Sequence, residues 1–384
     1  MGYPIRKWND VLSIISGKNQ KVVADSSGQY PIYGSGGIMG YANNYLCEAG
    51  TTIIGRKGTI NRPIFVNERF WNVDTAFGVF PGEMLHPKFL FYFCQSFNFK
   101  ALDKSTTIPS LAKRDLLNIE MPVPSFPEQE HIISRIEELF SQLDASVAEL
   151  KTAKERLKVY RQAVLKEAFE GTLTGSEKIG MAPLGNYVEK PRYGTSKKCG
   201  YTQTEKSVEV YRIPNIDYAT GQISHQDIKY SEFSDDELAQ ITLKCGDILI
   251  VRSNGSVSLV GRAALIREID IKGTFAGYLM RLRLKDKSSL VPAFLLYFLQ
   301  SHEARIYIEN KAKSTSGVHN INSTEISGLM VPIFRVDAQQ CIVSALESRL
   351  SVCDSIEKTV DTALQEAEAL RQSILKKAFE GRLD

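Results

Sequence analysis

Basic and amide side chains gather in two glycine-containing turns, each placed between two apolar runs. These residues are Arg56, Lys57 and Arg62 in the first turn and Arg252, Ser253 and Asn254 in the second. Arginine can donate two parallel hydrogen bonds to O6 and N7 of guanine, and asparagine can pair with adenine in the same manner. The turns therefore have the side chains needed to read base edges in a DNA groove. For any one residue, a solvated loop charge is an equally good interpretation.

Further polar residues are candidates for contacts with the phosphate backbone of DNA. The glycine-rich stretch YPIYGSGGIMGY at 30–41 offers Tyr33, Ser35 and Tyr41. The stretch PRYGTSKK at 191–198 predicts a phosphate clamp made of Arg192, Tyr193, Ser196, Lys197 and Lys198. Two polar runs in matching places, KSTT at 104–107 and KSTSGVHN at 313–320, add Lys104, Lys313 and Asn320.

Sequence signals for catalysis are missing. An adenine methyltransferase needs an [Asn/Asp]-Pro-Pro-aromatic loop, and the sequence has no Asn-Pro, Asp-Pro or Pro-Pro dipeptide and no phosphate loop ending in Gly-Lys-[Ser/Thr]. The five histidines show no arrangement typical of nucleophilic catalysis. The six cysteines form no C-x-x-C pair, which argues against a zinc site and for reduced thiols in a cytoplasm. We therefore expect no catalytic residue and no metal ligand.

Two modules must position the candidate residues. In the first, residues 50–66 predict strand, turn and strand, residues 30–41 a tight turn between short strands, and residues 86–97 an apolar helix. The second module repeats this order loosely, with a strand, turn and strand at 246–266 and a helix at 291–302.

A repeat of about fifty residues follows each module. Shifting the sequence by 210 positions aligns RQAVLKEAFEGTL at 161–173 with RQSILKKAFEGRL at 371–383, identical at nine of thirteen positions. Each copy predicts one long helix, stopped at Gly171 or Gly381. Apolar or small residues recur in steps of four and three, which is typical of a coiled-coil seam. The predicted seam contains Ile132, Ile136, Leu139, Leu143, Ser146, Leu150, Ala153, Leu157, Tyr160 and Val164 in the first helix, and Ile342, Leu346, Cys353, Ile356, Val360, Ala363, Ala367, Leu370 and Ile374 in the second, with a break at Arg349.

Charge divides along the same boundaries. Residues 1–120 carry 13 Lys and Arg against 9 Asp and Glu, and residues 181–330 carry 19 against 16. The helical segments are acidic, with 8 against 10 in 121–180 and 7 against 9 in 331–384. Basic modules are compatible with phosphate contacts, although a solvated surface shows the same excess. No apolar stretch approaches the length of a membrane span or a signal peptide, so we expect a cytoplasmic protein without a membrane partner.

The order of module, helix, module and helix resembles the specificity subunit of type I restriction-modification systems. The resemblance covers the full length and includes PVPSFPEQEHIISRIEELF at 122–140 and LKEAFEGTL at 165–173. GDILI at 246–250 and TTIPSLAKRDLLNI at 106–119 are typical of the target-recognition domains of that family. The second helix departs from the pattern at its start, where Asp337 and Ala338 replace the Pro-Glu of Pro127 and Glu128.

The resemblance implies an α+β fold with target-recognition domains at 1–120 and 181–330. The repeated helices at 121–180 and 331–384 would pair as an antiparallel coiled coil with pseudo-twofold symmetry. Each domain would read one half of a split, asymmetric site in double-stranded DNA. The chain would dock two methyltransferase subunits and also the restriction (translocase) subunits. S-adenosylmethionine and ATP with Mg²⁺ would belong to these partners, and this chain would bind no cofactor.

Two other function classes remain open at this point. One is a structural, two-domain coiled-coil interaction protein without a nucleic-acid role, against which the paired basic modules count. The other is a methyltransferase with its own recognition domain, against which the missing Pro-Pro loop counts.

Overall fold

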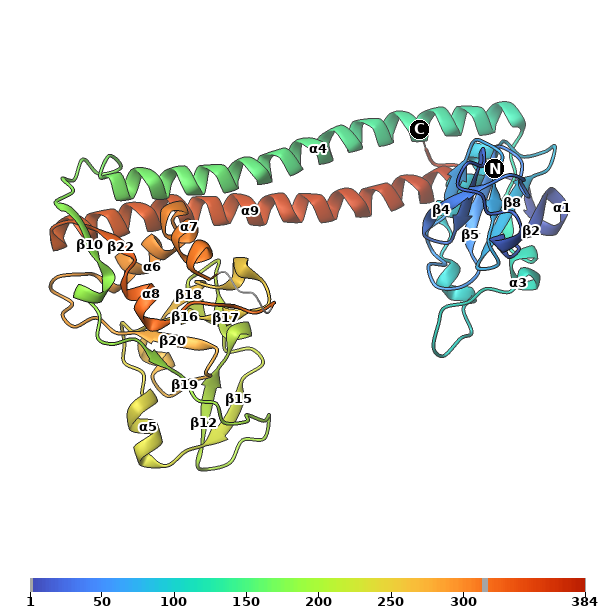
Figure 1. Ribbon diagram of the computed structural model, residues 1–384. Coiled ribbons are helices and arrows are strands. Elements are labelled where there is room, and N and C mark those ends of the chain that lie inside the picture. The colour runs from blue at the N-terminus through green and yellow to red at the C-terminus, as the bar shows by residue number, and fades with distance from the viewer. Residues whose placement is uncertain (1–2, 313–316, 384) are drawn as a thin grey trace. The chain divides into compact units, whose positions relative to one another are not determined.

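The chain folds into two compact units, each with one globular module and part of both long helices. A computed structural model describes residues 3–312 and 317–383 (Figure 1). Unit 1 consists of Met1–Thr152 with Val360–Asp384, and unit 2 consists of Ala153–Thr359. The long helices are α4 (Phe126–Glu170) and α9 (Val336–Phe379). The two predicted long helices are therefore confirmed, and α9 forms despite the departure at Asp337 and Ala338.

The module of unit 1 is built on two sheets. The larger has the strand order β2-β8-β5-β6, and the smaller has the order β4-β3-β7 with β3 and β7 parallel. A separate pair joins β1 to β9. The bounds are β1 (Ile5–Lys7), α1 (Trp8–Val11), β2 (Leu12–Ser16), β3 (Tyr30–Gly34), β4 (Gly37–Ala42), β5 (Thr51–Gly55), β6 (Ile64–Val66), β7 (Trp71–Asn72), β8 (Ala76–Pro81), α2 (Pro87–Ser96), α3 (Lys113–Leu117) and β9 (Glu120–Pro122).

The module of unit 2 repeats this plan. Its larger sheet has the order β11-β20-β16-β18, and its smaller sheet has the order β15-β12-β19 with β12 and β19 parallel. The pair of β10 and β22 corresponds to that of β1 and β9. The bounds are β10 (Gly180–Pro183), β11 (Arg192–Tyr193), β12 (Ser207–Tyr211), β13 (Ile216–Asp217), β14 (Gln222–Ile223), β15 (Lys229–Glu232), α5 (Asp235–Ile241), β16 (Ile248–Val251), β17 (Ser253–Asn254), β18 (Ala263–Leu265), β19 (Thr274–Phe275), β20 (Leu279–Leu282), α6 (Pro292–Gln300), α7 (His302–Lys311), β21 (His319–Asn320), α8 (Ser323–Ser327) and β22 (Met330–Ile333).

The elements predicted from local patterns are confirmed, whereas several others were not anticipated. Strands β3 and β4 occupy 30–41, β5 and β6 occupy 50–66, and β16 and β18 occupy 246–266. Helices α2 and α6 occupy the two predicted apolar stretches. Strand β8 and the strands from β12 to β15 were not predicted; of these, β13 and β14 have only two residues each, which gives no periodicity to recognise.

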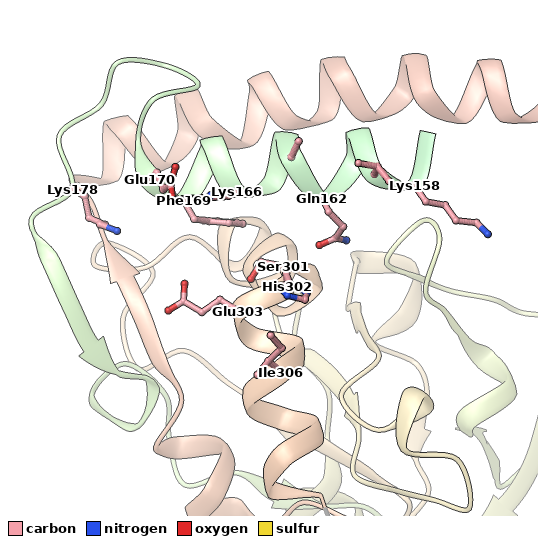
Figure 2. A pocket seen from close by; sticks show the side chains of 12 residues that line it. Lys158, Gln162, Lys166, Phe169, Glu170, Lys178, Ser301, His302, Glu303 and Ile306 are labelled. Atoms are coloured by element: carbon pink, nitrogen blue, oxygen red, sulfur yellow. Dashed lines mark ion pairs between the residues drawn. The ribbon is translucent and has the colours of Figure 1, made fainter. Parts of the chain in front are cut away.

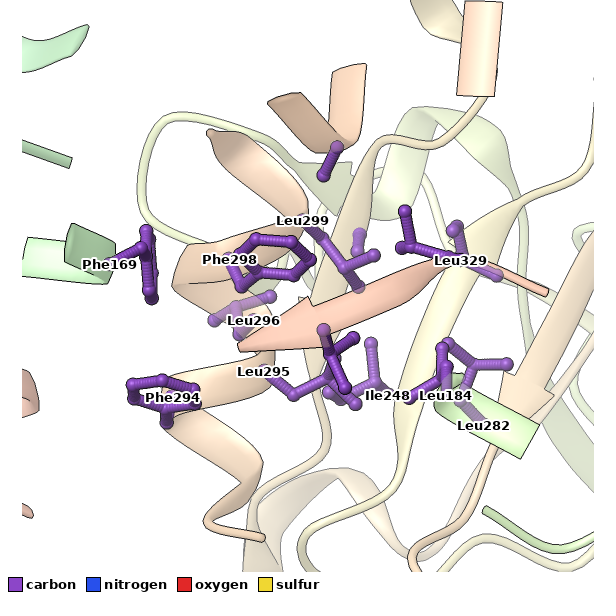
Figure 3. Close-up of a cluster of buried hydrophobic side chains, with 14 of the residues drawn as sticks. Phe169, Leu184, Ile248, Leu282, Phe294, Leu295, Leu296, Phe298, Leu299 and Leu329 are labelled. Carbon is purple, nitrogen blue, oxygen red and sulfur yellow. The ribbon is translucent and has the colours of Figure 1, made fainter. Parts of the chain in front are cut away.

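The same aromatic cluster anchors a long helix to the module in each unit. In unit 2, Phe169 of α4 meets Phe294 and Phe298 of α6 edge to face, with both pairs of ring centroids 5.2 Å apart (Figure 3). In unit 1, the corresponding contacts join Phe379 of α9 to Phe89 and Phe93 of α2, at 5.1 and 5.4 Å. Aromatic rings bury large apolar areas and favour this geometry, so these contacts stabilise the docking of the helix on the module.

A buried glutamine forms a second recurring anchor near the start of each long helix. Gln129 and Gln339 are both fully buried. Nε2 of Gln129 donates to the carbonyls of Met84 (2.8 Å) and Pro124 (3.0 Å), and its Oε1 accepts from the His86 amide (2.8 Å). Nε2 of Gln339 donates to the carbonyls of Ser289 (3.1 Å) and Phe334 (2.9 Å), and its Oε1 accepts from the Val291 amide (2.8 Å). The amides that donate to the two glutamines belong to His86 and Val291, the residues just before α2 and α6. Each glutamine therefore links the long helix to the module helix.

The predicted seam is wrong in the middle of both helices. Ser146, Tyr160, Ile356 and Leu370 are exposed. The half-buried positions are instead Val147, Arg161, Glu357 and Arg371, and Leu350 continues the seam beside Arg349. Long guanidinium side chains can cross a helix interface and reach a carboxylate on the other helix, so they replace apolar residues there.

Reciprocal ion pairs link the two long helices within each unit. In unit 2, Arg161 of α4 contacts Asp354 (2.6 Å) and Glu357 (3.1 Å) of α9. In unit 1, Arg371 of α9 contacts Asp144 of α4 and lies over the ring of Phe140. The two pairs are related by the 210-residue shift. In unit 2 the contact between Arg349 and Glu167 joins a later residue of α4 to an earlier residue of α9, so the two segments run in opposite directions there.

A glycine follows each long helix, as the repeat predicts. Gly171 has φ of 87° and Gly381 has φ of 69°, a left-handed conformation in which a side chain would be strained. Across the described ranges, no helix combines the length and the apolar character needed to cross a membrane.

Candidate nucleic-acid interface

The turns that carry Arg56 and Arg252 have equivalent backbone surroundings. The amide of Arg56 donates to the Thr75 carbonyl (2.8 Å), and that of Arg252 donates to the Tyr278 carbonyl (2.9 Å). Each arginine carbonyl accepts a hydrogen bond from the segment before the long helix, from Leu111 in unit 1 and Ile321 in unit 2, both at 2.9 Å. Both arginines directly follow an inner strand of their four-stranded sheet, β5 or β16. The correspondence expected between the two turns is thus present in the fold.

Both guanidinium groups are also held in similar ways. Nη1 of Arg56 donates to the Asp74 carbonyl at 3.3 Å, and Nη1 of Arg252 donates to the Gly277 carbonyl at 3.1 Å. The Arg252 guanidinium lies 4.3 Å from the ring centre of Tyr193, whereas that of Arg56 lies 5.9 Å from Phe77. Arg252 is therefore the more tightly oriented of the two.

Arg252 lies in a hollow of unit 2 that gathers residues from distant parts of the sequence. This unit 2 hollow has a volume of about 660 Å³. It is lined by the expected residues Tyr193, Ser196, Lys197, Arg252 and Ser253, and by Arg212, Lys229 and Tyr278, which sequence reasoning missed. Tyr278 is 63% exposed, and it follows β19 in a turn whose sequence carries no distinctive signal. The lining includes four basic residues and two tyrosines, side chains that are suited to contacts with nucleic acid.

Salt bridges divide the basic residues of the hollow into compensated and uncompensated charges. Lys197 pairs with Glu237 at 2.7 Å, and Arg212 pairs with Asp227 at 2.7 Å. The hydrogen bond from Lys197 lowers the pKa of Glu237, and that from Arg212 lowers the pKa of Asp227. For Arg252, the ion pairs found among the described residues include none with a carboxylate. Arg252 therefore brings an uncompensated positive charge to the hollow.

The predicted phosphate clamp at 191–198 is not a single cluster. Tyr193 lies against Arg252, and Lys197 already has an acidic partner. Arg192 and Lys198 are exposed and do not line the unit 2 hollow. Alternation along β11 separates Arg192 from Tyr193, because successive side chains of a strand point to opposite sides.

Asn254 and Asn320, two further candidates of unit 2, belong to the strand pair that carries Ser253. Ser253 and Asn254 form β17, which pairs with β21 so that Ser253 stands opposite Asn320. Ser253 is buried, with 6% of its surface exposed, whereas Asn320 is exposed. Lys313 lies outside the described residues.

In unit 1, the hairpin of β3 and β4 lies next to the arginine turn. A Cβ added to Gly55 would lie 3.1 Å from Cβ of Ser35, which places Ser35 close to the residue before Arg56. Tyr41 is 48% exposed on this hairpin. Tyr33 is half-buried and its ring meets Phe70 at 5.4 Å, so it supports the hairpin from within. Burial, with the nearby Glu68 carboxylate, raises the pKa of Tyr33.

The other basic candidates of unit 1 are exposed. Lys57 and Arg62 lie on the surface, and Lys57 forms a β-bridge with Ser110. Lys104 pairs with Asp115 at 3.0 Å. The charge of Lys104 is therefore already partly compensated.

A second hollow of unit 2 lies between α4 and α7 (Figure 2). It has a volume of about 900 Å³. Val159, Phe169 and Ile306 contribute apolar surface, and lysines from α4 lie around it, so its walls suit protein contacts better than catalysis. Within the described ranges, no group of three or more His, Cys, Asp or Glu residues could hold a metal ion.

The sequence of this chain matches those of known proteins. Residues 2–155 match the family described as "Type I restriction modification DNA specificity domain". The chain is 32% identical over 329 residues to the type I restriction enzyme StySPI specificity subunit of Salmonella potsdam, covering 81% of this chain and 69% of the relative. It is 30% identical to the EcoKI specificity subunit of Escherichia coli (strain K12), with the same coverage of both chains.

Solved structures agree on the fold. The chain resembles a structure titled "Structural basis underlying complex assembly and conformational transition of the type I R-M system", with a TM-score of 0.76, 17% identity, and coverage of 99% of this chain and 98% of the other. The HsdS subunit from Thermoanaerobacter tengcongensis gives a TM-score of 0.57 at 16% identity, with 99% and 97% covered. With two recurring modules, two long helices and this degree of sequence identity, the chain belongs to the family of type I restriction-modification specificity subunits.

Proposed function

We propose that this chain recognises a bipartite, asymmetric DNA sequence, with the module of each unit reading one half-site. The observation that carries the proposal is the recurrence of one arrangement in both units: an arginine directly after an inner strand of the larger sheet, held by a neighbouring carbonyl. A duplicated reading position suits a DNA site with two separate halves. Because the modules differ in the residues around their arginines, the two half-sites should differ in sequence.

The long helices would act as a spacer and a platform for partners. The reciprocal pairs of Arg161 with Asp354 and Arg371 with Asp144 support an antiparallel coiled coil with pseudo-twofold symmetry. On this proposal, two methyltransferase subunits bring S-adenosylmethionine, and restriction subunits bring ATP and Mg²⁺. The chain itself recognises DNA without catalysing a reaction, and the assembly works in the cytoplasm.

Methylation mapping tests this function. The chain is produced in a host lacking other methylation, with and without a methyltransferase subunit of the same type I system. We expect adenine methylation at one split sequence only when both proteins are present. Methylation by the purified chain alone would contradict the non-catalytic role. Methylation by the complex that ignores DNA sequence would contradict the recognition role.

A further inference from the structure

In the unit 2 hollow, Arg252 has no carboxylate partner among the described residues, unlike Lys197 and Arg212, and both a carbonyl and an aromatic ring hold its guanidinium. Its Nη1 donates to the Gly277 carbonyl at 3.1 Å, and its Cζ is 4.3 Å from the ring centre of Tyr193. Its Nε is buried without a hydrogen-bond partner, so this edge of the group faces the protein. The outer end of the guanidinium, with the remaining Nη hydrogens, is left for a ligand.

Tyr193 is itself fixed at both ends. Its backbone pairs with Met280 in the larger sheet of unit 2. Its hydroxyl accepts a hydrogen bond from the Ser323 amide, at 3.1 Å, at the start of α8. The aromatic ring is therefore a rigid surface on which the guanidinium lies.

A fixed, planar pair of donors can recognise the edge of a base, which a mobile charge cannot do. Phosphate can be bound by a flexible point charge, whereas guanine presents O6 and N7 in one plane and needs two parallel donors in a defined orientation. Orienting a cation with both a carbonyl and a ring therefore favours base reading over backbone contact. The buried Nε excludes the side-on arrangement and leaves the end-on one, through Nη1 and Nη2.

We propose that Arg252 reads a guanine of the unit 2 half-site end-on, and that Tyr193 is the positioning residue that fixes its guanidinium. This inference rests on the proposed DNA recognition and adds the base and the two residues responsible. The half-site read by unit 2 therefore contains a guanine, and its N7 is a required acceptor.

The test uses the complete methyltransferase complex and duplexes carrying its mapped target. Each guanine of the target is replaced in turn by 7-deazaguanine, which lacks the N7 acceptor. For the wild-type complex we expect binding to weaken about tenfold at one position, because a hydrogen bond to a charged group is lost. Arg252→Ala weakens binding to the natural target by roughly tenfold to a hundredfold and makes it indifferent to 7-deazaguanine at that position.

Substitutions at the two residues separate orientation from charge. Arg252→Lys keeps the charge, so we expect wild-type binding to random DNA together with loss of the preference for guanine over adenine. Tyr193→Leu removes the ring and lowers that preference, whereas Tyr193→Phe keeps the ring and restores it. Arg262→Ala is the matched control, because Arg262 also lies over a tyrosine ring, at 4.9 Å from Tyr218, and also has a buried, unpartnered Nε, but does not line the hollow.

Three results would overturn the inference. The first is that no guanine shows an N7 dependence that disappears in Arg252→Ala. The second is equal weakening of target and random DNA by Arg252→Ala, which makes Arg252 a phosphate contact. The third is that Tyr193→Phe loses as much guanine preference as Tyr193→Leu. A wild-type complex without sequence preference would instead reject the proposed function itself, so the two failures are distinguishable.

Discussion

At the residue scale, the glutamines Gln129 and Gln339 show how one buried polar side chain joins three backbone segments. Each side-chain amide donates to two backbone carbonyls and accepts from one backbone amide. An apolar residue could also fill this buried position, but it could not form hydrogen bonds with the three backbone groups. Buried polar groups without partners cost free energy, so glutamine is favoured here.

We expect Gln129→Leu and Gln339→Leu each to lower the free energy of unfolding by about 2–4 kcal/mol, because three backbone groups lose their partner. Denaturant unfolding followed by circular dichroism measures the change. Gln142→Leu is the control, since Gln142 is exposed on α4 and makes only a long contact of 3.5 Å with Glu138. A loss no greater for the buried positions than for Gln142 would show that water satisfies these groups equally well.

Tyr92 gives a pH dependence at the same scale. Burial, reinforced by the Glu137 carboxylate that accepts a hydrogen bond from the hydroxyl at 3.2 Å, raises the pKa of Tyr92 to about 12. In the unfolded chain a tyrosine releases its proton near pH 10. Between these values the unfolded state holds fewer protons than the folded state, so stability falls as pH rises.

Tyr92→Phe should remove part of this loss. We expect wild-type protein to lose roughly 1–2 kcal/mol more stability than Tyr92→Phe between about pH 10 and pH 12. Unfolding curves across this range provide the measurement, and Tyr160→Phe on the exposed surface of α4 is the control. Parallel curves for wild type and Tyr92→Phe would mean that the hydroxyl titrates normally.

At the scale of elements, the pairing of α4 with α9 depends on charged as well as apolar seam residues. Arg161 has 23% of its side chain exposed and contacts two carboxylates of α9. Such partly buried pairs are sensitive to the loss of one partner, since the other charge is left near an apolar surface.

Exchange of the charges tests this pairing. We expect Arg161→Asp to destabilise the protein because it faces Asp354 and Glu357, and the double variant Arg161→Asp with Asp354→Arg to recover about 0.5–1.5 kcal/mol of coupling. Thermal unfolding of the four proteins of the cycle measures the coupling. The exposed pair of Lys158 and Glu155, within α4 alone, provides the control cycle. Additive effects for Arg161 and Asp354 would show that their contact does not stabilise the helix pair.

At the scale of the whole molecule, the proposed coiled coil predicts a fixed separation between half-sites. Seven residues inserted after Leu150 and after Val360 preserve the seam and add about 10 Å to each helix. This corresponds to about three base pairs at roughly 3.4 Å each. We expect methylation mapping to find the same two half-sites with a longer gap, and weaker activity because the half-sites are rotated about the duplex.

The number of base pairs between the two half-sites is the quantity that tests this prediction. Insertion of seven residues into only one helix is the matched control, and it should disrupt the pairing rather than lengthen the gap. An unchanged gap with activity retained in the double insertion would mean that the helices do not set the spacing.

Local patterns in the sequence predicted the elements that depend on local interactions. The long helices follow from residues spaced three and four apart and from glycines at which left-handed backbone costs little. The duplication and the family resemblance were also visible, because both are comparisons of residue order. The place of Arg56 and Arg252 after strongly apolar strands was predicted for the same reason.

Only the tertiary structure decided which side chains meet. Tyr193, Lys229, Arg252 and Tyr278 come from separate strands and turns, and only strand pairing brings them to one hollow. Periodicity alone chose Tyr160 for the seam, whereas the carboxylates of α9 place Arg161 there. Likewise, Lys197 was predicted to be available for phosphate, yet Glu237 compensates its charge. Such outcomes depend on partners far away in sequence, and the free energy of a charged or aromatic side chain is determined mainly by those partners.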